Sequence, residues 1–397
     1  MLKMYFDYRD VFRAVRLGLS PKKMWVMFWG LTCGLVIYGV FGYLAHLASG
    51  KSLAETWTIF GLLPAAPWPG AGLWPWLLWT LGVAGGLLAY ILFSSAVARL
   101  AAEQLKGNEF FEVKGAFGHI GRHWKSILGG TAVIGSFLIL IVFGGVLLGW
   151  WGRIPVLGEL GVALLALPAF LVCLFAIFLM VSLAVGLFFS PVISGATQGD
   201  SFDNLFEVFS SITSQPWRLV VYTGLLKLLA GAATMILASF AIAALGFAYQ
   251  VLAGSMGGKF AELAIAAFNL YTPPLALNCL AGAAAQCPWA AGLPSGLLAT
   301  PELNWSGQLS AFLLGMSLNV VRLLVLSYGL SVFVTGQTII YGIIVMKRDQ
   351  RNIFETKDDE ACPAPEEKAV IQAETEEAPK AKPGKAVRKR KAPAKSK

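Results

Sequence analysis

The sequence predicts an all-α integral membrane protein with about six transmembrane helices and a polar C-terminal tail. Composition is the first reason, because 57% of the 397 residues are hydrophobic and only 13% are charged, which excludes an ordinary soluble domain. The second reason is a set of six apolar runs, each long enough to cross a bilayer as a helix. The third is an amphipathic segment that recurs along the chain. It predicts three repeats of an interfacial helix followed by a membrane hairpin.

The six predicted spans form a membrane domain over residues 24–346. Each span is expected to be a helix, because a helix satisfies its own backbone hydrogen bonds, as a segment in lipid must. Leu309–Val321 is also apolar, and it either extends the last span or dips into the membrane. The spans are Met24–Ala48, Leu73–Val97, Ile127–Trp151, Leu160–Val192, Leu219–Leu245 and Leu323–Met346.

Residues 107–124 are the clearest copy of the recurring interfacial segment. Asn108 is the expected N-cap, since its side chain can accept hydrogen bonds from free backbone N–H groups. Helical spacing places apolar residues on one side of this segment and polar residues on the other. The apolar stripe consists of Phe110, Val113, Phe117, Ile120 and Trp124, and the polar side of Glu109, Glu112, His119, Arg122 and His123.

Two other segments repeat this pattern, residues 199–217, with Asp200 as the expected N-cap, and a looser copy in residues 1–23. We expect all three helices to lie on the membrane surface with their apolar stripes in the headgroups or against the spans. The second stripe consists of Phe202, Leu205, Phe209 and Ile212, and the N-terminal stripe of Tyr8, Phe12, Val15 and Leu19.

Lys and Arg residues concentrate before the first span, between the second and third, and after the last. The positive-inside rule therefore places these segments and both termini in the cytoplasm. The first span is too long for a signal peptide, so we expect the chain to retain it. Basic residues of the interfacial segments are the expected contacts to anionic lipid headgroups. They are Arg9, Arg13, Arg16, Lys22, Lys23, Lys114, Arg122 and Lys125.

Residues 251–308 form a long outer segment. Apolar spacing over residues 260–270 predicts a helix on the outer surface, and the glycine- and proline-rich remainder is expected to be loop. Cys279 and Cys287 lie in that remainder. They either form a disulfide that closes a small loop, which an oxidising compartment favours, or remain two free thiols.

Residues 347–397 form a cytoplasmic tail that we expect to be disordered, because the chain from Glu355 onward is polar, charged and rich in Pro and Ala. An acidic block, 355–377, precedes a basic block, 380–397. The possible targets of the basic block are anionic lipid, the acidic block itself, or an external polyanion such as nucleic acid. A chain ending at Asp349 is expected to keep a folded membrane domain. The proposed tether is the cluster Arg388, Lys389, Arg390 and Lys391.

The sequence contains no phosphate loop, zinc-protease motif or nucleophile elbow, so we expect neither an enzyme nor a bound cofactor. His119 and His123 stand four residues apart, a spacing that can chelate a metal, but no third ligand is near. We therefore expect no metal site and a solvated polar face at this point. No Asp or Glu lies within the predicted spans, which argues against proton-coupled transport.

Small residues are frequent in the spans, and they let helices approach one another closely. Gly30 and Gly34 form one such step in the first span. These faces pack either within the chain or against a protein partner in the membrane. The glycines of the third span are Gly129, Gly130, Gly135, Gly144, Gly145 and Gly149.

The interfacial segments share a Gly-Asn/Asp-x-Phe … Trp pattern, carried by residues 107–110 with Trp124 and by residues 199–202 with Trp217. With the repeats and the small-residue spans, this pattern resembles bacterial multi-pass membrane proteins, such as the membrane domain attached to some glycerophosphodiester phosphodiesterases. The resemblance implies the multi-pass topology and a location in the bacterial inner membrane. It transfers no active site, because the chain has no catalytic phosphodiesterase domain.

The sequence therefore predicts a non-enzymatic membrane scaffold, or an accessory subunit of a membrane assembly, that contacts anionic lipids. The alternative is a permease or lipid-handling transporter for a neutral or lipid substrate, with a cavity between the repeats. A polar cavity lined by residues of different repeats would favour transport. A filled interior with a broad exposed apolar side would favour the scaffold.

Overall fold

The computed structural model describes residues 4–271 and 303–355 of the chain. The chain divides into two compact units, Met1–Phe354 and Glu355–Lys397. The two cysteines that could form a disulfide and the proposed tether lie outside the described residues. They are Cys279, Cys287, Arg388, Lys389, Arg390 and Lys391.

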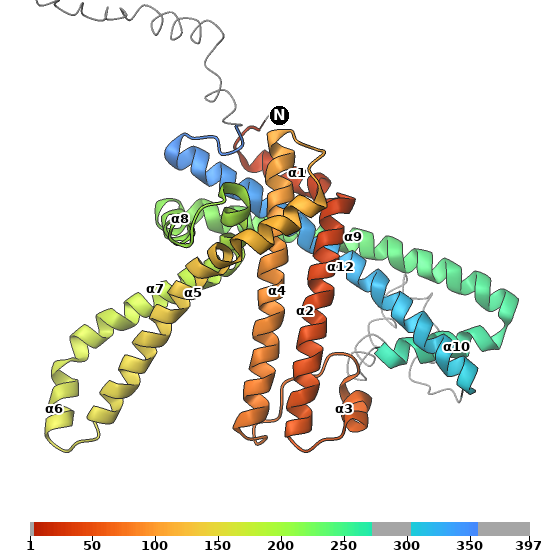
Figure 1. Cartoon of the computed structure of the whole chain (residues 1–397), viewed down its shortest axis with the longest axis horizontal. Helices are drawn as coiled ribbons and strands as arrows, with labels where there is room; N and C mark the ends of the chain where they lie inside the picture. Colours follow the sequence, from red (N-terminus) through yellow and green to blue (C-terminus); the bar gives the residue numbers. More distant parts are fainter. Residues whose placement is uncertain (1–3, 272–302, 356–397) are drawn as a thin grey trace, which may run out of the picture. The chain divides into compact units, whose positions relative to one another are not determined.

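The described residues form helices joined by turns and loops, with no strand among them (Figure 1). Six of the helices are long and apolar enough to cross a membrane, which confirms the predicted set of six and is consistent with a polytopic membrane protein. These six are α2 Pro21–Ala48, α4 Leu73–Lys106, α5 Val113–Trp151, α7 Ala166–Thr197, α9 Pro216–Met256 and α12 Trp305–Asp349. The shorter helices are α1 Tyr8–Gly18, α3 Leu53–Phe60, α6 Leu157–Leu164, α8 Ser201–Ser214 and α10 Gly258–Tyr271.

Several helix boundaries differ from the predicted ones. Leu309–Val321 belongs to α12, which is continuous, so this segment extends the last span. The fourth span begins later than predicted, because α6 ends at Leu164 and α7 begins at Ala166. The helix predicted over residues 260–270 is present as α10.

The interfacial segment at 107–124 is not a separate helix, contrary to prediction. Gly107 adopts a left-handed conformation with φ of 97° and ends α4. The backbone N–H of Asn108 then donates to the Glu103 carbonyl at 2.9 Å, so Asn108 completes the end of α4 and is not an N-cap. Glu112 is the N-cap instead, and α5 runs without a break to Trp151. The recurrence of the three segments therefore stays a prediction.

The N-cap predicted at Asp200 is confirmed at the start of α8. The Asp203 carboxylate accepts a hydrogen bond from the Asp200 backbone N–H at 3.2 Å. This bond satisfies the backbone N–H of Asp200, which would otherwise have no hydrogen-bond partner at the start of the helix. The segment 199–217 thus contains a short amphipathic helix, as predicted.

The core forms around the C-terminal half of α12. Residues 327–345 are almost entirely buried, and α12 contacts α1, α2, α4, α7, α8 and α9. Val332 packs on Gly18 of α1, and the Ser331 hydroxyl donates to the Gly18 carbonyl at 2.9 Å. Gly336 leaves space for Leu226 of α9. One helix is therefore the shared packing partner of most others.

Glycines also set the contacts between the other spans. A Cβ on Gly34 of α2 would lie 3.3 Å from the Gly86 carbonyl of α4, and Gly30 faces Phe93 of the same helix. These two glycines pack within the chain. Gly195 of α7 is tighter, because a Cβ there would lie 2.7 Å from the backbone oxygen of Ser95 in α4.

The membrane domain ends later than predicted. Phe354 is 3% exposed and its ring fills the space beside Gly342 of α12. The chain turns back to reach this position, with Gln350 in a left-handed conformation at φ of 54°. Residues 350–354 therefore pack with the folded unit, and a chain ending at Asp349 would lose a buried side chain of this unit.

We predict that Gly195→Ala lowers the free energy of unfolding by about 1–3 kcal/mol, since the new methyl group meets backbone atoms that cannot move aside. Gly135→Ala in α5 is the matched control, because a methyl group added there meets nothing within 4 Å. That variant should be neutral or stabilising by up to about 1 kcal/mol through helix propensity. Thermal unfolding of the purified variants in mild detergent measures both, and equal midpoints would contradict the close α4–α7 contact.

We predict that a chain ending at Glu355 unfolds at the same temperature as the full chain, whereas one ending at Asp349 is destabilised. The shorter chain loses the buried Phe354 ring, and loss of a buried phenyl ring costs about 3–5 kcal/mol. Phe354→Ala in the full chain should reproduce most of this loss. A stable chain ending at Asp349 would show that residues 350–354 do not pack on α12.

Candidate functional site

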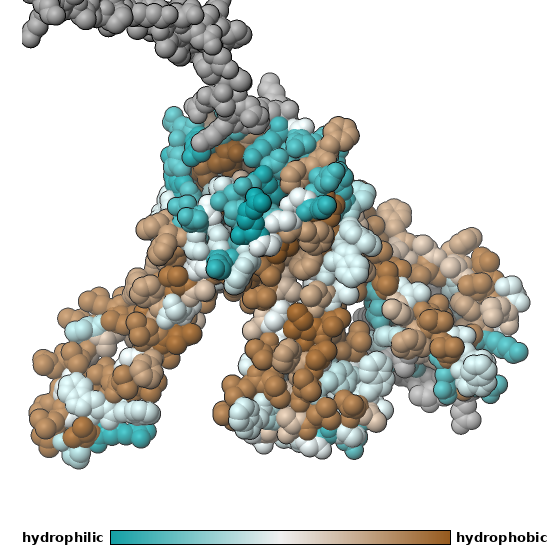
Figure 2. Space-filling view, viewed as in Figure 1, coloured by the Kyte–Doolittle hydropathy of each residue, from teal (hydrophilic) through white to brown (hydrophobic). Residues whose placement is uncertain are grey.

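Hydrophilic and hydrophobic residues separate within the folded unit. Figure 2 shows hydrophilic side chains gathered where α1 and α8 lie, and hydrophobic side chains along the long helices. We call this hydrophilic region the basic end. It contains α1, α8, residues 113–126 of α5, the start of α2 and the ends of α4, α7 and α12.

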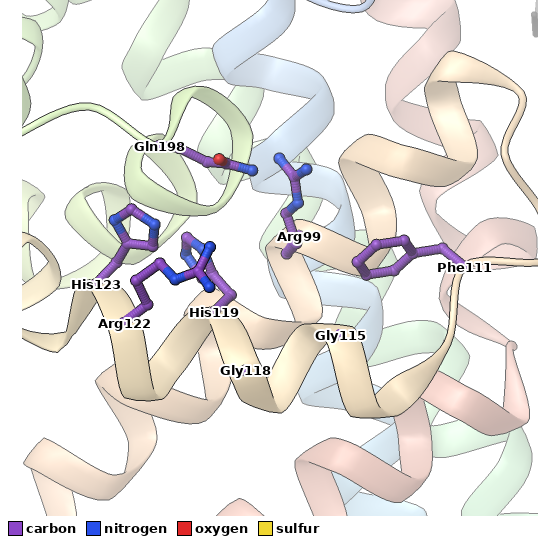
Figure 3. A pocket seen from close by; sticks show the side chains of 8 residues that line it. All are labelled: Arg99, Phe111, Gly115, Gly118, His119, Arg122, His123 and Gln198. Carbon is purple, nitrogen blue, oxygen red and sulfur yellow. The ribbon is translucent and has the colours of Figure 1, made fainter.

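A cavity of about 330 Å³ opens at the basic end (Figure 3). Its residues come from three helices and the loop before α5. The cavity therefore lies between the end of the first hairpin and the start of the second. It is lined by Arg99, Phe111, Gly115, Gly118, His119, Arg122, His123 and Gln198.

The crossing of α4 and α7 at Gly195 places the cavity residues. Because α7 has no side chain at this point, its end lies against the backbone of Ser95 and Arg99. Three residues later, Gln198 ends α7 in a left-handed conformation with φ of 57°. With its amide oxygen toward α4, Gln198 accepts a hydrogen bond from Arg99 Nη2 at 2.6 Å. The close contact between α4 and α7 thus places Gln198, at the end of α7, beside the Arg99 guanidinium of α4.

Arg99 is held on several sides. Its Nη2 forms an ion pair with the Glu103 carboxylate at 2.8 Å, one turn further along α4. Glu103 also pairs with Lys106 at 3.4 Å. The Arg99 guanidinium lies 5.8 Å from the centre of the Phe111 ring, within cation–π range. Since its rotamers are restricted, Arg99 presents a fixed positive charge to the cavity.

His119 is buried, contrary to the predicted solvated face. It is 7% exposed, and its Nε2 lies 3.2 Å from the Ser95 hydroxyl. The His123 ring stacks on it with centroids 4.9 Å apart. Helical spacing predicted the wrong side for His119, because α4 and α7 cover this part of α5. Among the described residues no group of three or more His, Cys, Asp or Glu side chains could hold a metal ion.

The predicted apolar stripe of α1 faces outward. Phe12 is 50% exposed, whereas Val11 and Ala14 on the opposite side are fully buried against the core. The exposed side is flanked by basic residues, including Arg9, whose pKa is raised by its hydrogen bond with Tyr8. An exposed apolar stripe beside basic groups suits a membrane surface, so this arrangement agrees with an interfacial helix.

Lys23 is buried, although the sequence predicted it on the surface. It is 2% exposed, and its Nζ donates to the Leu17 carbonyl at the end of α1 at 3.0 Å. Lys23 therefore does not present its ammonium group to lipid headgroups, contrary to the prediction for this residue. Lys22 is exposed, although its Nζ also donates to the carbonyls of Glu109 and Phe111 at 3.2 and 3.3 Å. Lys114, Arg122 and Lys125 are exposed on α5, as are Arg9 and Arg16 on α1, while Arg13 is half-buried.

The helix α8 is fastened to its neighbours by polar contacts. The buried Asn204 amide donates to the Ser126 carbonyl of α5 at 2.9 Å. Three residues further along α8, Glu207 pairs with Arg348 of α12 at 3.0 Å. Gly130 lets the α8 backbone approach, since a Cβ there would lie 3.2 Å from the Leu205 nitrogen. These contacts hold α8 against α5 and α12 at the basic end.

The far halves of the long helices differ from the basic end, because their apolar side chains are exposed. Ile139 of α5 is 71% exposed and Phe170 of α7 is 58% exposed. Around them, α5 and α7 pair with each other and are joined through α6. We call residues 135–181 the apolar arm. Nothing lies within 4 Å of the Cβ positions of Gly144 and Gly145 on this arm.

Sequence reasoning missed five of the eight cavity residues, namely Arg99, Phe111, Gly115, Gly118 and Gln198. Arg99 was visible only as a basic residue after the second span, and Gln198 as the residue before the Gly199–Asp200 pair. The position of Gln198 just after a long apolar run was the available signal, because a polar residue there can turn toward the neighbouring helix end.

No protein-family model matches this chain, and neither the curated proteins nor the solved structures include a significant match.

We predict that the same substitution at two neighbouring residues of α1 changes the free energy of unfolding by very different amounts. Val11→Asp should lower the free energy of unfolding by about 3 kcal/mol or more, because it buries an unpaired charge. Phe12→Asp should change it by less than about 0.5 kcal/mol, since its side chain is half exposed. Thermal unfolding in uncharged detergent compares the pair. If Phe12→Asp were the damaging change, the orientation of α1 described above would be wrong.

Proposed function

We propose that this chain is a non-enzymatic membrane scaffold, an accessory subunit whose apolar arm binds the membrane helices of another protein. Its basic end lies in the anionic headgroups of the cytoplasmic leaflet of a bacterial inner membrane, with both termini in the cytoplasm. The Lys and Arg distribution and the exposed stripe of α1 support this orientation.

The exposed apolar arm is the observation that carries the proposal. A self-contained bundle of six spans would cover the inner sides of its helices with one another. Here the arm exposes large side chains on both helices, including Phe137 at 53% and Phe175 at 51%. Such a surface contacts lipid or the helices of another protein.

The small residues of the arm favour a protein partner over lipid alone. Helices in lipid associate through close van der Waals packing, which small residues permit. Gly30 and Gly34 are used within the chain, whereas the Cβ positions of Gly135, Gly144 and Gly145 face open space. An adjoining helix can therefore approach the α5 backbone closely at these positions.

The cavity lining supports a role without catalysis. It consists of arginine, histidine, glutamine, glycine and phenylalanine, and it holds neither a hydroxyl or thiol nucleophile nor a carboxylate. Covalent transfer through a serine, threonine, cysteine, aspartate or glutamate intermediate needs such groups. Binding without reaction is the simpler use of this set.

We predict that Gly144→Leu with Gly145→Leu releases the partner while leaving the chain folded. The added side chains enter open space in this chain but occupy the surface where the partner helix packs. The measurement is the mass of the particle extracted from native membranes in mild detergent, with photo-crosslinking from position 147 to identify the neighbour. We expect the wild type to carry a discrete second protein and the double variant to lose it without a change in unfolding temperature.

Gly121→Leu is the matched control for this test. It makes the same substitution on the same helix, also in open space, but at the basic end. The partner should remain bound to it. If the double variant keeps the partner, or if the wild type runs at the mass of one chain and crosslinks only to lipid, the scaffold proposal fails.

A further inference from the structure

The cavity at the basic end has the charge of an anion site. Two guanidinium groups, Arg99 and Arg122, line it together with the imidazoles of His119 and His123, and no carboxylate is among the lining residues. Glu103 lies behind Arg99, where it is shared with Lys106. The two guanidinium cations would repel a metal ion from the histidine pair, and they would attract an anion.

The donors of the cavity are arranged before any ligand binds. Glu103, Gln198 and the Phe111 ring hold the Arg99 guanidinium in place. Arg122 has no ion-pair partner among the described residues and is exposed on the side of the cavity. Figure 3 shows Arg122, His119 and His123 side by side on α5, across from Arg99. A fixed guanidinium and an exposed one on opposite walls suit a tetrahedral oxyanion, which accepts hydrogen bonds in several directions.

The cavity lies at the level where the spans begin. His123 precedes Ile127, the first residue of the apolar run of α5, by about 6 Å of helix. Trp124 between them is 49% exposed, and tryptophan prefers the headgroup level. The exposed Phe117 lies on the same stretch of α5. A phosphate of a membrane lipid and a phosphate in solution can both reach a site at this depth.

We infer that this cavity is a binding site for a phosphate group, held by Arg99 and Arg122 with His123 as a further donor. The phosphate is presented by an anionic lipid headgroup or by a soluble phosphate compound. The cavity volume of about 330 Å³ is at the small end of the usual range for small-molecule sites and leaves room beyond the phosphate itself. The site goes beyond the scaffold role, because its residues bind a phosphate whether or not the apolar arm holds a partner.

The test compares Arg122→Gln with Lys114→Gln in the full-length chain. Both changes remove one exposed positive charge from α5, but only Arg122 lines the cavity. The first arm titrates purified protein in uncharged detergent with inorganic phosphate, exchanged against chloride at constant ionic strength, by calorimetry. The second arm counts lipids retained from phosphatidylcholine vesicles containing phosphatidic acid, by native mass spectrometry. Unfolding temperatures confirm that both variants are folded.

We expect one phosphate group per chain in the wild type, at least tenfold weaker binding in Arg122→Gln, and a change of less than twofold in Lys114→Gln. Loss in the inorganic phosphate arm identifies a soluble source, and loss of one retained phosphatidic acid identifies a lipid source. Either result supports the site. The inference is overturned if the wild type binds neither probe, or if both variants weaken binding equally, which would show diffuse surface attraction only. Neither outcome depends on Gly144 or Gly145, so this test and that of the scaffold fail separately.

Discussion

The burial of the C-terminal half of α12 is the constraint on which the folded unit depends. In a bilayer the surrounding lipid is as apolar as the side chains, so helices associate through close packing and polar contacts. The helix supplies both. Val332 and Gly336 interlock with α1 and α9, while the Ser331 hydroxyl bonds to α1. Arg348 at its end then pairs with α8. These contacts make α12 the shared packing partner of α1, α8 and α9.

The same packing builds the cavity. It requires α4 and α7 to meet almost backbone to backbone, which the missing side chain of Gly195 allows. Ser95 then stands beside the start of α5 and fixes His119, while Gln198 at the end of α7 reaches Arg99. The charged side chains are thus positioned by apolar and small residues within the spans.

The sequence predicted the helices better than their contacts. Apolar runs predicted all six long helices, because length and hydropathy in lipid leave few alternatives to a helix. The end of α4 was missed, since Asn108 has the chemistry of an N-cap and only the left-handed Gly107 before it shows that it completes α4. His119 was misplaced because periodicity in one helix cannot reveal which neighbours cover it. The cavity depends on the crossing of α4 and α7, where residues about a hundred positions apart in the sequence meet. Local sequence patterns do not predict such a crossing.

Because α5 is continuous, the proposed phosphate site and the apolar arm share one helix. Had residues 107–124 formed a separate interfacial helix, the phosphate site and the apolar arm would lie on bodies joined by a bend. Instead one helix carries His123 near its start and Gly145 near its end, about 33 Å apart. Because α5 has no break between these residues, its backbone hydrogen bonds connect the cavity directly to the apolar arm.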